Sequence, residues 1–500
     1  MKKMKIASGQ AKRSHDSQRD NSKLAWGHFY VPRMAFVMTA SCLEFVLSVA
    51  VFAQSPSSSP ALSEPKATLR ISTHSAVLMH KQIHSASTAD TFYSRNPLAP
   101  HDILADPFFS QVKALNLQSL GFEQDASAVH HHVVVGDTRV YGGKGDGYNI
   151  SAEETRARGL DIAEIVDGVG AHHFGKDFFN EYCAMLEKLG IPGAVTVNTR
   201  SGTLDEVLWE IERAHAERVV FGLEQVTRSH SSFFPTGKTY VEKVTPWVRA
   251  VKNKYPNVVT VLDAAWETRP AHLQWNRDLQ AMEGDQVRIY LWDRDLYGPV
   301  KAKDAASRIN DSFTKVLPQM IAGIQKTFPN KKISVLQWGL KPGGQNYNTV
   351  FGCLHVAKMY QWLITFNREN ANLIDYASFT NLKNLLLAKQ GVSCHYYALK
   401  LCGQLFEGAP KVLEASVTGA DGVHVLCCEQ NGKFMLLQIN ANSREITIPS
   451  VLVDGAPTGA KSFRKEAIYG KNLETNQIAH EEGTSQIIAL KPYSVSIIRF

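Results

Sequence analysis

The sequence predicts an α/β protein with two domains, a (β/α)8 barrel (TIM barrel) followed by an all-β sandwich. Between about residue 105 and residue 390, helix-length segments with apolar residues at helical spacing alternate with short apolar runs, as repeated βα units do. After Pro410 this alternation of helix-length and strand-length segments ends. Short runs of alternating apolar and polar residues follow, separated by Asp-Gly and Asn-Gly pairs. A length of 500 residues also exceeds what one small core needs.

One βα unit is clear around residues 178–189, where apolar residues recur every three or four positions and predict a helix. Gly190 and Pro192 end that helix, and an apolar strand follows at Ala194–Asn198. Thr203–Glu206 then has the capping-box pattern that begins another helix. Such units over roughly 280 residues suit a (β/α)8 barrel, whose usual size is about 250 residues. Later strands are expected at residues 218–222, 258–263, 287–292 and 333–337.

We assign residues 69–409 to the barrel and residues 410–500 to the C-terminal sandwich. In the second domain, Asn431-Gly432 joins two alternating runs, residues 424–430 and 433–440, and is a strong hairpin signal. The chain closes on an alternating apolar run at 492–500, which is typical of a last strand.

The N-terminal segment, residues 1–53, is basic and then apolar, and ends in Val51-Phe-Ala53. This pattern predicts a secretory signal peptide and hence a secreted or periplasmic protein. Because the apolar run is close to spanning length, an uncleaved membrane anchor is the alternative, and membrane contact is expected only in that case. Residues 54–68 are rich in Ser and Pro and predict a disordered linker.

Charge and metal-ligand patterns exclude several classes of function. Residues 1–53 carry eight Lys or Arg and three Asp or Glu, a balance of +5, which leaves +2 of the formal +7 for the rest. No basic patch remains to bind nucleic acid. The histidine clusters 130–132 and 172–173 have no carboxylate or cysteine at ligand spacing, so we expect neither a metal nor another cofactor. The six cysteines after Cys42 are expected in the core, although a Cys394–Cys402 disulfide is conceivable.

Four parts of the chain share their order and spacing with one family of proteins. They are Ala194–Glu206, Val220–Gln225 with Gly237–Lys243, Ile333–Leu340 with the helical segment 357–368, and Leu490–Ser494. Together they resemble the α-L-arabinofuranosidase type of glycoside hydrolase, in the clan of retaining (β/α)8-barrel glycosidases. The resemblance covers roughly residues 105–500, and it implies a barrel cleft that holds an oligo- or polysaccharide.

The resemblance implies two catalytic positions. Glu224, at the end of the fourth barrel strand, would be the general acid/base, and Gln337, at the end of the seventh, occupies the position of the nucleophile. A retaining glycosidase needs a carboxylate at each position. An amide oxygen is uncharged and a weak nucleophile, so Gln337 argues against ordinary retaining catalysis.

Three other departures from the family pattern point the same way. Leu223 stands where the family has Asn, the sixth strand at 287–292 lacks its His, and Leu120–Asp125 replaces an Arg-Phe-Pro-Gly-Gly motif. We therefore interpret the chain as a catalytically degenerate, carbohydrate-binding pseudoenzyme. Two alternatives remain open: an active arabinofuranosidase- or xylosidase-like hydrolase with a relocated carboxylate, and a non-catalytic interaction scaffold. Candidates for the relocated carboxylate are Glu267, Asp293 and Asp295.

Several strand-end residues are candidates for sugar binding. Asn198 could hydrogen-bond a sugar hydroxyl, and the aromatic residues Tyr290, Trp292 and Trp338 could stack on sugar faces, with Trp266 as a further aromatic near the cleft. At strand ends such residues serve equally often in core packing, so this assignment is a hypothesis about the cleft.

Overall fold

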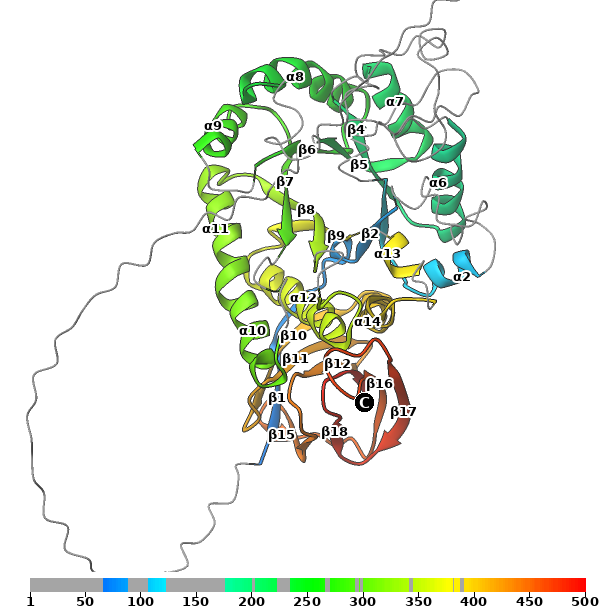
Figure 1. Cartoon of the computed structure of the whole chain (residues 1–500), viewed down its shortest axis with the longest axis vertical. Helices are drawn as coiled ribbons and strands as arrows, with labels where there is room; N and C mark the ends of the chain where they lie inside the picture. The colour runs from blue at the N-terminus through cyan, green and yellow to red at the C-terminus, as the bar shows by residue number, and fades with distance from the viewer. Residues whose placement is uncertain are drawn as a thin grey trace, which may run out of the picture. The chain divides into compact units, whose positions relative to one another are not determined.

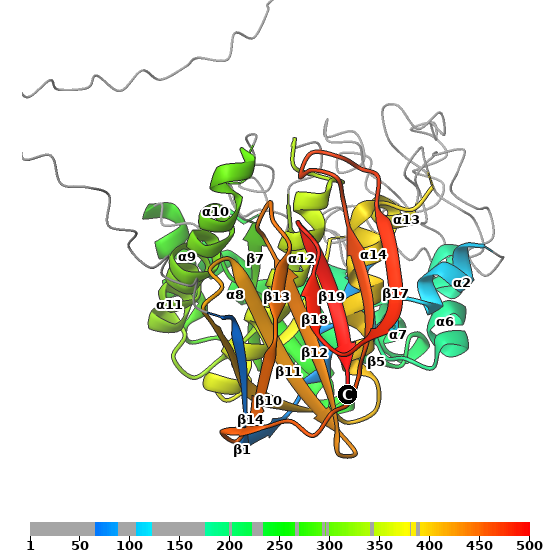
Figure 2. The ribbon, with the colours of Figure 1, turned by 90° about the horizontal axis from the view of Figure 1, so that it is seen from below.

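The computed structural model describes residues 66–88, 107–122, 176–199, 203–222, 234–265, 270–292, 296, 300–340, 345–380, 382–386 and 391–500. It confirms the predicted fold class: eight parallel strands close into a barrel, and a separate, mostly antiparallel sheet follows (Figures 1 and 2). Within the described residues, no helix is both long and apolar enough to cross a membrane. The predicted signal segment, residues 1–53, lies outside them.

The barrel strands run in chain order, and β2 pairs with β9 to close the ring. They are β2 (Ser85–Ser87), β3 (Ser119–Phe122), β4 (Gly193–Asn198), β5 (Ala216–Gly222), β6 (Val259–Asp263), β7 (Gln286–Trp292), β8 (Lys332–Gly339) and β9 (Ile374–Phe379). Every strand expected from the sequence is present. The fourth and seventh barrel strands, β5 and β8, are those whose ends were predicted to carry the two catalytic positions.

Helices surround the barrel, as Figure 1 shows. The larger ones are α6 (Lys176–Leu189), α7 (Leu204–Arg213), α8 (Gly237–Lys254), α9 (Pro270–Leu279), α10 (Ala305–Asp311), α11 (Leu317–Thr327), α12 (Val350–Glu369) and α14 (Cys394–Gly403). Short helices are α2 (Phe108–Lys113) and α13 (Leu382–Leu386). The predicted capping box begins α7: the Thr203 hydroxyl accepts from the Glu206 N–H at 3.3 Å, and the Glu206 carboxylate accepts from the Thr203 N–H at 2.7 Å.

Strand β7 shows how the barrel separates two environments. Its Val287, Ile289 and Leu291 are buried in the large apolar core that the strands share with the helices. Because side chains alternate along a strand, Gln286, Arg288 and Tyr290 occupy the opposite face, toward the barrel interior. Burying each aliphatic side chain contributes about 1.5–3 kcal/mol. On β7, apolar packing therefore lies on the outer face of the barrel and polar side chains lie on the inner face.

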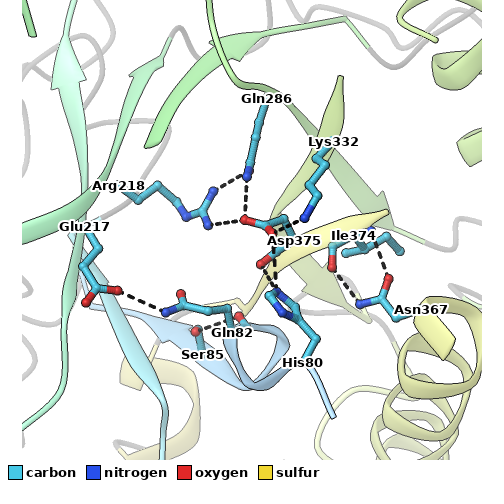
Figure 3. Close-up of polar contacts among 10 residues, drawn as sticks. All are labelled: His80, Gln82, Ser85, Glu217, Arg218, Gln286, Lys332, Asn367, Ile374 and Asp375. Atoms are coloured by element: carbon cyan, nitrogen blue, oxygen red, sulfur yellow. Dashed lines mark hydrogen bonds and ion pairs between the residues drawn. The ribbon is translucent and has the colours of Figure 1, made fainter. Parts of the chain in front are cut away.

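The amino-terminal mouth of the barrel is closed by polar residues around Asp375 (Figure 3). Arg218 Nη2 lies 2.9 Å from the Asp375 carboxylate, Gln286 Nε2 donates to it at 2.5 Å, and Lys332 Nζ donates at 3.1 Å. His80 Nε2 lies 2.6 Å from the Asp375 backbone oxygen. These contacts tie the first residues of β5, β7, β8 and β9 together, and at this face of a barrel they serve stability.

The C-terminal domain contains a nine-stranded sheet in the order β15-β14-β1-β10-β11-β12-β19-β16-β17 and a two-stranded sheet, β13-β18. The bounds are β1 (Thr68–Leu78), β10 (Lys411–Thr418), β11 (Val423–Gln430), β12 (Lys433–Asn440), β13 (Ile446–Ile448), β14 (Ser450–Val453), β15 (Ala456–Pro457), β16 (Phe463–Tyr469), β17 (Ala479–Ser485), β18 (Ile488–Leu490) and β19 (Ser494–Arg499). Apolar residues of both sheets share one core, which gives the predicted sandwich.

The predicted hairpin is confirmed. Strands β11 and β12 pair from Val423–Asn440 to Gln430–Lys433. Asn431 and Gly432 between them have φ of 53° and 76°, the left-handed values that a two-residue hairpin turn requires.

The domain boundary differs from the prediction. Residues from 69 were assigned to the barrel, but β1 pairs antiparallel with β10 and parallel with β14 in the C-terminal sheet. Leu69 and Ile71 are buried in the sandwich core. Strand pairing between the two ends of a chain is a long-range contact, and the local pattern of residues 68–78 contains no sign of it. The linker predicted at 54–68 meets this strand at Thr68.

All six cysteines of the described residues are buried and free, as core packing predicts. Cys394 and Cys402 begin and nearly end the same helix, α14. Eight residues of helix span about 12 Å, which is too far for a disulfide. The conceivable Cys394–Cys402 bridge is therefore excluded by geometry.

Candidate functional site

The carboxyl end of the barrel is the face where a (β/α)8 protein builds its site, and Gln337 lies there on β8. The register between β7 and β8 shifts by one residue: Ile289 lies opposite Val335, whereas Tyr290 lies opposite Gln337. The extra residue, Leu336, forms a β-bulge. Because of this bulge, Gln337 shares the inward orientation of Tyr290 instead of the outward orientation of Val335.

The Gln337 side chain is buried, with 7% of the residue exposed. Its amide makes no hydrogen bond to any residue that the structure describes. Gln286, at the opposite end of the barrel, is fully engaged with Arg218 and Asp375. The amide of Gln337 is thus an unused donor and acceptor at the face where a ligand would enter.

Trp338 does not contribute to this site, contrary to the prediction. The same bulge turns it away from the interior, and it is completely buried. Its ring contacts Tyr360 of α12 at 5.2 Å and Phe379 at 5.0 Å between centroids, both edge to face. Trp338 is a core residue that fixes β8 against α12 and the end of β9.

One carboxylate lies at the carboxyl ends of the eight strands among the described residues. It is Asp263, the last residue of β6, and it faces Arg288 on β7. Arg288 Nε lies 2.5 Å from Asp263 Oδ1 and Nη2 lies 3.1 Å from Oδ2, with both side chains almost fully buried. The Arg288 guanidinium also lies 5.2 Å from the centre of the Tyr290 ring. Asp263, Arg288 and Tyr290 therefore form a connected group just below the level of Gln337.

Helix α8 fixes the ends of the fourth and fifth barrel strands. The Tyr240 hydroxyl donates to the Phe221 carbonyl at 2.6 Å and accepts from the Asp263 N–H at 3.5 Å. Burial, and next the nearby Asp263 charge, raise the pKa of Tyr240 far above its usual value, so the hydroxyl stays a donor. Trp275 Nε1 of α9 donates to the Asp263 carbonyl at 2.8 Å.

Three threonines tie neighbouring strand ends at the same face. Each follows a barrel strand, and its hydroxyl donates to a backbone carbonyl of the adjacent strand. The pairs are Thr88 to Gly121 at 2.9 Å, Thr199 to Gly222 at 2.7 Å, and Thr380 to Trp338 at 2.9 Å. These bonds satisfy carbonyls at the ends of the ladder and hold β3, β5 and β8 in place.

The C-terminal domain supports the connection after β8. Helix α12 begins there, and its first two N–H groups donate to backbone carbonyls of the β16–β17 connection: Val350 to Thr475 at 2.9 Å and Phe351 to Leu473 at 3.1 Å. The Thr349 hydroxyl accepts from the Gly352 N–H at 3.4 Å. The start of α12 is thus capped jointly by its own N-cap residue and by the second domain.

Most other predicted site residues lie outside the described residues. β5 ends at Gly222, two residues before Glu224, which is outside. Asn198 and Trp292 are the last residues of β4 and β7, so both lie at the carboxyl end of the barrel, although their side chains are not described. The remaining positions outside are Trp266, Glu267, Asp293, Asp295, residues 123–125 and the two histidine clusters.

Sequence reasoning missed the Asp263–Arg288 pair and Tyr240. A signal for the pair was present, because Arg288 interrupts an apolar strand and Asp263 ends the neighbouring one. A charge in the middle of a buried strand needs a partner. The hydroxyl of Tyr240 gave no such signal, since aromatic residues are common on the apolar stripe of a helix.

No family model and no curated protein sequence matches the chain. Solved structures do match its fold. The α-L-arabinofuranosidase from Thermotoga maritima, solved as an arabinose complex, gives a TM-score of 0.63 at 14% identity, covering 87% of this chain and 99% of that one. A family 51 α-L-arabinofuranosidase from Bifidobacterium longum gives 0.61 at 10% identity, with 87% and 99% covered. A family 44 xyloglucanase from Paenibacillus polymyxa gives 0.58 at 11% identity, again with 87% and 99% covered.

The chain therefore has the fold of an α-L-arabinofuranosidase-type glycoside hydrolase, and it has both parts of that fold, the barrel and the β domain. This confirms the resemblance read from the sequence at the level of the fold. The chemistry of the cleft has to be argued from its own residues.

Proposed function

We propose that the barrel cleft binds an oligo- or polysaccharide and does not cleave it by the retaining mechanism. The observation that carries this proposal is Gln337. It lies at the carboxyl end of the seventh barrel strand and faces inward beside Tyr290, and its amide makes no hydrogen bond to the described residues.

The chemistry of an amide supports binding without cleavage. A retaining glycosidase attacks the anomeric carbon with a carboxylate, whose charge also stabilises the oxocarbenium-like transition state. A neutral amide supplies neither effect. It does supply one acceptor and two donors, which match the hydroxyls of a sugar. A sugar in the cleft could therefore take up the donors and the acceptor of the Gln337 amide.

Asp263 is a poor substitute nucleophile. Its carboxylate is held by two hydrogen bonds from Arg288, and both side chains are sealed from solvent. Releasing that carboxylate to attack a sugar would break two hydrogen bonds to a buried cation, which costs several kcal/mol. The described part of the cleft thus contains no carboxylate free to attack.

The structural neighbours support carbohydrate as the ligand class. One of them is an α-L-arabinofuranosidase solved with arabinose and another is a xyloglucanase. We propose pentose-containing polysaccharides as the first ligands to test. We also propose that the protein acts outside the cytoplasm, because residues 1–53 have the pattern of a secretory signal.

The test is a binding measurement by titration calorimetry with arabino-oligosaccharides and xylo-oligosaccharides, comparing the natural chain with Gln337→Ala. We expect the natural chain to bind and Gln337→Ala to bind about tenfold more weakly, the loss of one or two buried hydrogen bonds. Gln319→Ala, at an exposed position on α11, is the matched control and should bind normally. Equal affinity of Gln337→Ala and the natural chain would refute a role for Gln337 in the cleft.

A further inference from the structure

A cavity lies in the C-terminal domain. Its volume is about 470 Å³, which is within the range of pockets that hold small ligands. Two parts of the chain form its walls. One is the turn end of the β11–β12 hairpin with the last strand, β19, and the other is the connection from η5 (Gln404–Phe406) to β10.

This cavity is distinct from the barrel cleft. Helix α14 begins after β9 at the carboxyl end of the barrel and runs back, so η5 and residues 407–410 lie toward the amino-terminal end. The Met79 N–H donates to the Pro410 carbonyl at 2.9 Å, shortly before β2 begins. Figure 2 shows the C-terminus, where β19 ends, on the lower side of the view and α13, which follows β9, on the upper side. Gln337 belongs to the carboxyl end, so the cavity and the cleft are at opposite ends.

Two aromatic rings line the cavity in a fixed arrangement. Phe434 and Phe500 are half-buried, with ring centroids 5.2 Å apart. Their backbones exchange hydrogen bonds, from the Phe434 N–H to the Phe500 carbonyl at 2.9 Å and from the Phe500 N–H to the Phe434 carbonyl at 3.1 Å. Phe500 also packs edge to face on Phe463 at 5.3 Å. Both rings pack against the sandwich core and border the cavity, so they form a rigid apolar wall.

Polar side chains complete the lining, among them Gln430 and Arg499. Gln430 lies directly over Gly408, whose φ is +64°; a Cβ there would come 1.6 Å from Gln430 Nε2. The missing side chain of Gly408 thus leaves room for the Gln430 amide beside the cavity. Arg499 donates to Gln404, and Gln404 Nε2 in turn donates to the Glu466 carboxylate at 2.8 Å.

The rim carries charges of opposite sign. Glu407 and Lys433 are both exposed, and they come from the two different walls of the cavity. Arg499 is already directed toward Gln404, so the rim offers hydrogen bonds of both kinds without strongly favouring an anion or a cation. An apolar ring wall with amide, carboxylate and ammonium groups at its edge matches a neutral, hydroxyl-rich ring, which stacks one face and hydrogen-bonds its edge.

We propose that this cavity is a second carbohydrate-binding site, for a neutral sugar unit of a polysaccharide chain. The ligand class rests on the proposed function, but the site does not depend on the barrel cleft. Two separate sites on one chain raise the effective affinity for long polymers over that for short oligosaccharides.

The experiment is native affinity electrophoresis in gels that contain soluble arabinoxylan or arabinan. The test variant is Glu407→Ala with Lys433→Ala, because both residues are exposed and their loss leaves the fold intact. The matched control is Glu474→Ala with Lys471→Ala, which also removes one exposed acid and one exposed base, in the β16–β17 connection. A third variant, Phe434→Ala, removes one ring of the wall, and its folding is checked by thermal unfolding.

We expect the test variant to bind the polymer about tenfold more weakly than the natural chain, the loss of two hydrogen bonds, and the control to bind normally. Phe434→Ala should also bind the polymer more weakly than the natural chain. Unchanged retardation of the Glu407→Ala, Lys433→Ala variant in both polymers would overturn the second site.

Gln337→Ala in the same gels separates this proposal from the proposed function. If only Gln337→Ala binds the polymers more weakly, the cleft is supported and the second site is overturned. If only the Glu407→Ala, Lys433→Ala variant binds them more weakly, the second site is supported and the role of the cleft is overturned. Absence of binding by the natural chain to either polymer would overturn both.

Discussion

Asp263 and Arg288 form a two-bonded ion pair between adjacent barrel strands, sealed from solvent beneath the carboxyl end of the barrel. The pair joins the fifth and sixth barrel strands, between the fourth and seventh strands whose ends carry the two predicted catalytic positions. It also supports Tyr290, whose ring lies beside the Arg288 guanidinium and whose strand position is opposite Gln337. The candidate site is therefore built on a structural ion pair.

Breaking this pair on one side should strongly destabilise the protein. Asp263→Asn or Arg288→Met removes one charge of the buried pair, and we expect each to lower the free energy of unfolding by about 3–5 kcal/mol. In the double variant both members of the pair are absent, so its loss of stability should be smaller than the sum of the two single losses by about 1–3 kcal/mol. Urea unfolding of the four proteins measures both quantities, and additive effects would show that the two residues do not interact.

Tyr240→Phe tests how helix α8 positions the ends of β5 and β6. The variant leaves the buried Phe221 carbonyl without its side-chain donor, and we expect a loss of about 1–3 kcal/mol in the free energy of unfolding. Carbohydrate binding should weaken as well, because both strand ends border the cleft. Tyr255→Phe is the control: its hydroxyl contacts the exposed Glu212 carboxylate at 3.0 Å, and its loss should change stability by less than about 0.5 kcal/mol. Equal effects of the two variants would argue against a special role for Tyr240.

Asp375 gives a pH-dependent contribution to stability. Burial alone would raise the pKa of Asp375, but the Arg218 charge and hydrogen bonds from Arg218, Gln286 and Lys332 lower it from 3.8 to about 2. Since the folded-state pKa is below the unfolded one, the stabilisation is complete above the unfolded pKa and is lost as the pH falls through about 2. Its size at neutral pH is about 2 kcal/mol.

The variant Asp375→Asn should lack this pH dependence. We expect the stability difference between the natural chain and the variant to be largest at neutral pH and to shrink between pH 4 and pH 2, as acid titration followed by circular dichroism would show. Asp311→Asn removes an exposed carboxylate paired with Lys315 at 2.7 Å and is the control. A constant difference down to pH 2 would show that Asp375 is not held ionised by its neighbours.

The sequence predicted the parts of this fold that depend on local patterns. The capping box at Thr203 and the Asn431-Gly432 hairpin formed as expected, because a few neighbouring residues determine each of them. The assignment of β1 to the barrel was wrong, because its partners β10 and β14 are more than 300 residues away in the chain. Local residue patterns cannot report such pairings.

At the candidate site, one extra residue in β8 prevented a correct prediction of which side chains face the barrel interior. With strict alternation, Gln337 would share the outward face of Ile333 and Val335, and Trp338 would face the interior. The bulge at Leu336 reverses this, so Gln337 faces inward and Trp338 becomes a core residue. A single sequence carries no reliable signal for a bulge. Only the structure therefore shows that Gln337 faces the interior and Trp338 does not.

The central claim is that Gln337 occupies the nucleophile position of a cleft that binds sugar without cleaving it. The most direct test is the release of nitrophenol from nitrophenyl α-L-arabinofuranoside by the natural chain, by Gln337→Glu, and by the exposed control Gln319→Glu. We predict no turnover by the natural chain or the control, and measurable turnover by Gln337→Glu, in which the carboxylate is restored. Turnover by the natural chain that disappears in Glu224→Gln would contradict the account and assign the role of nucleophile to another carboxylate.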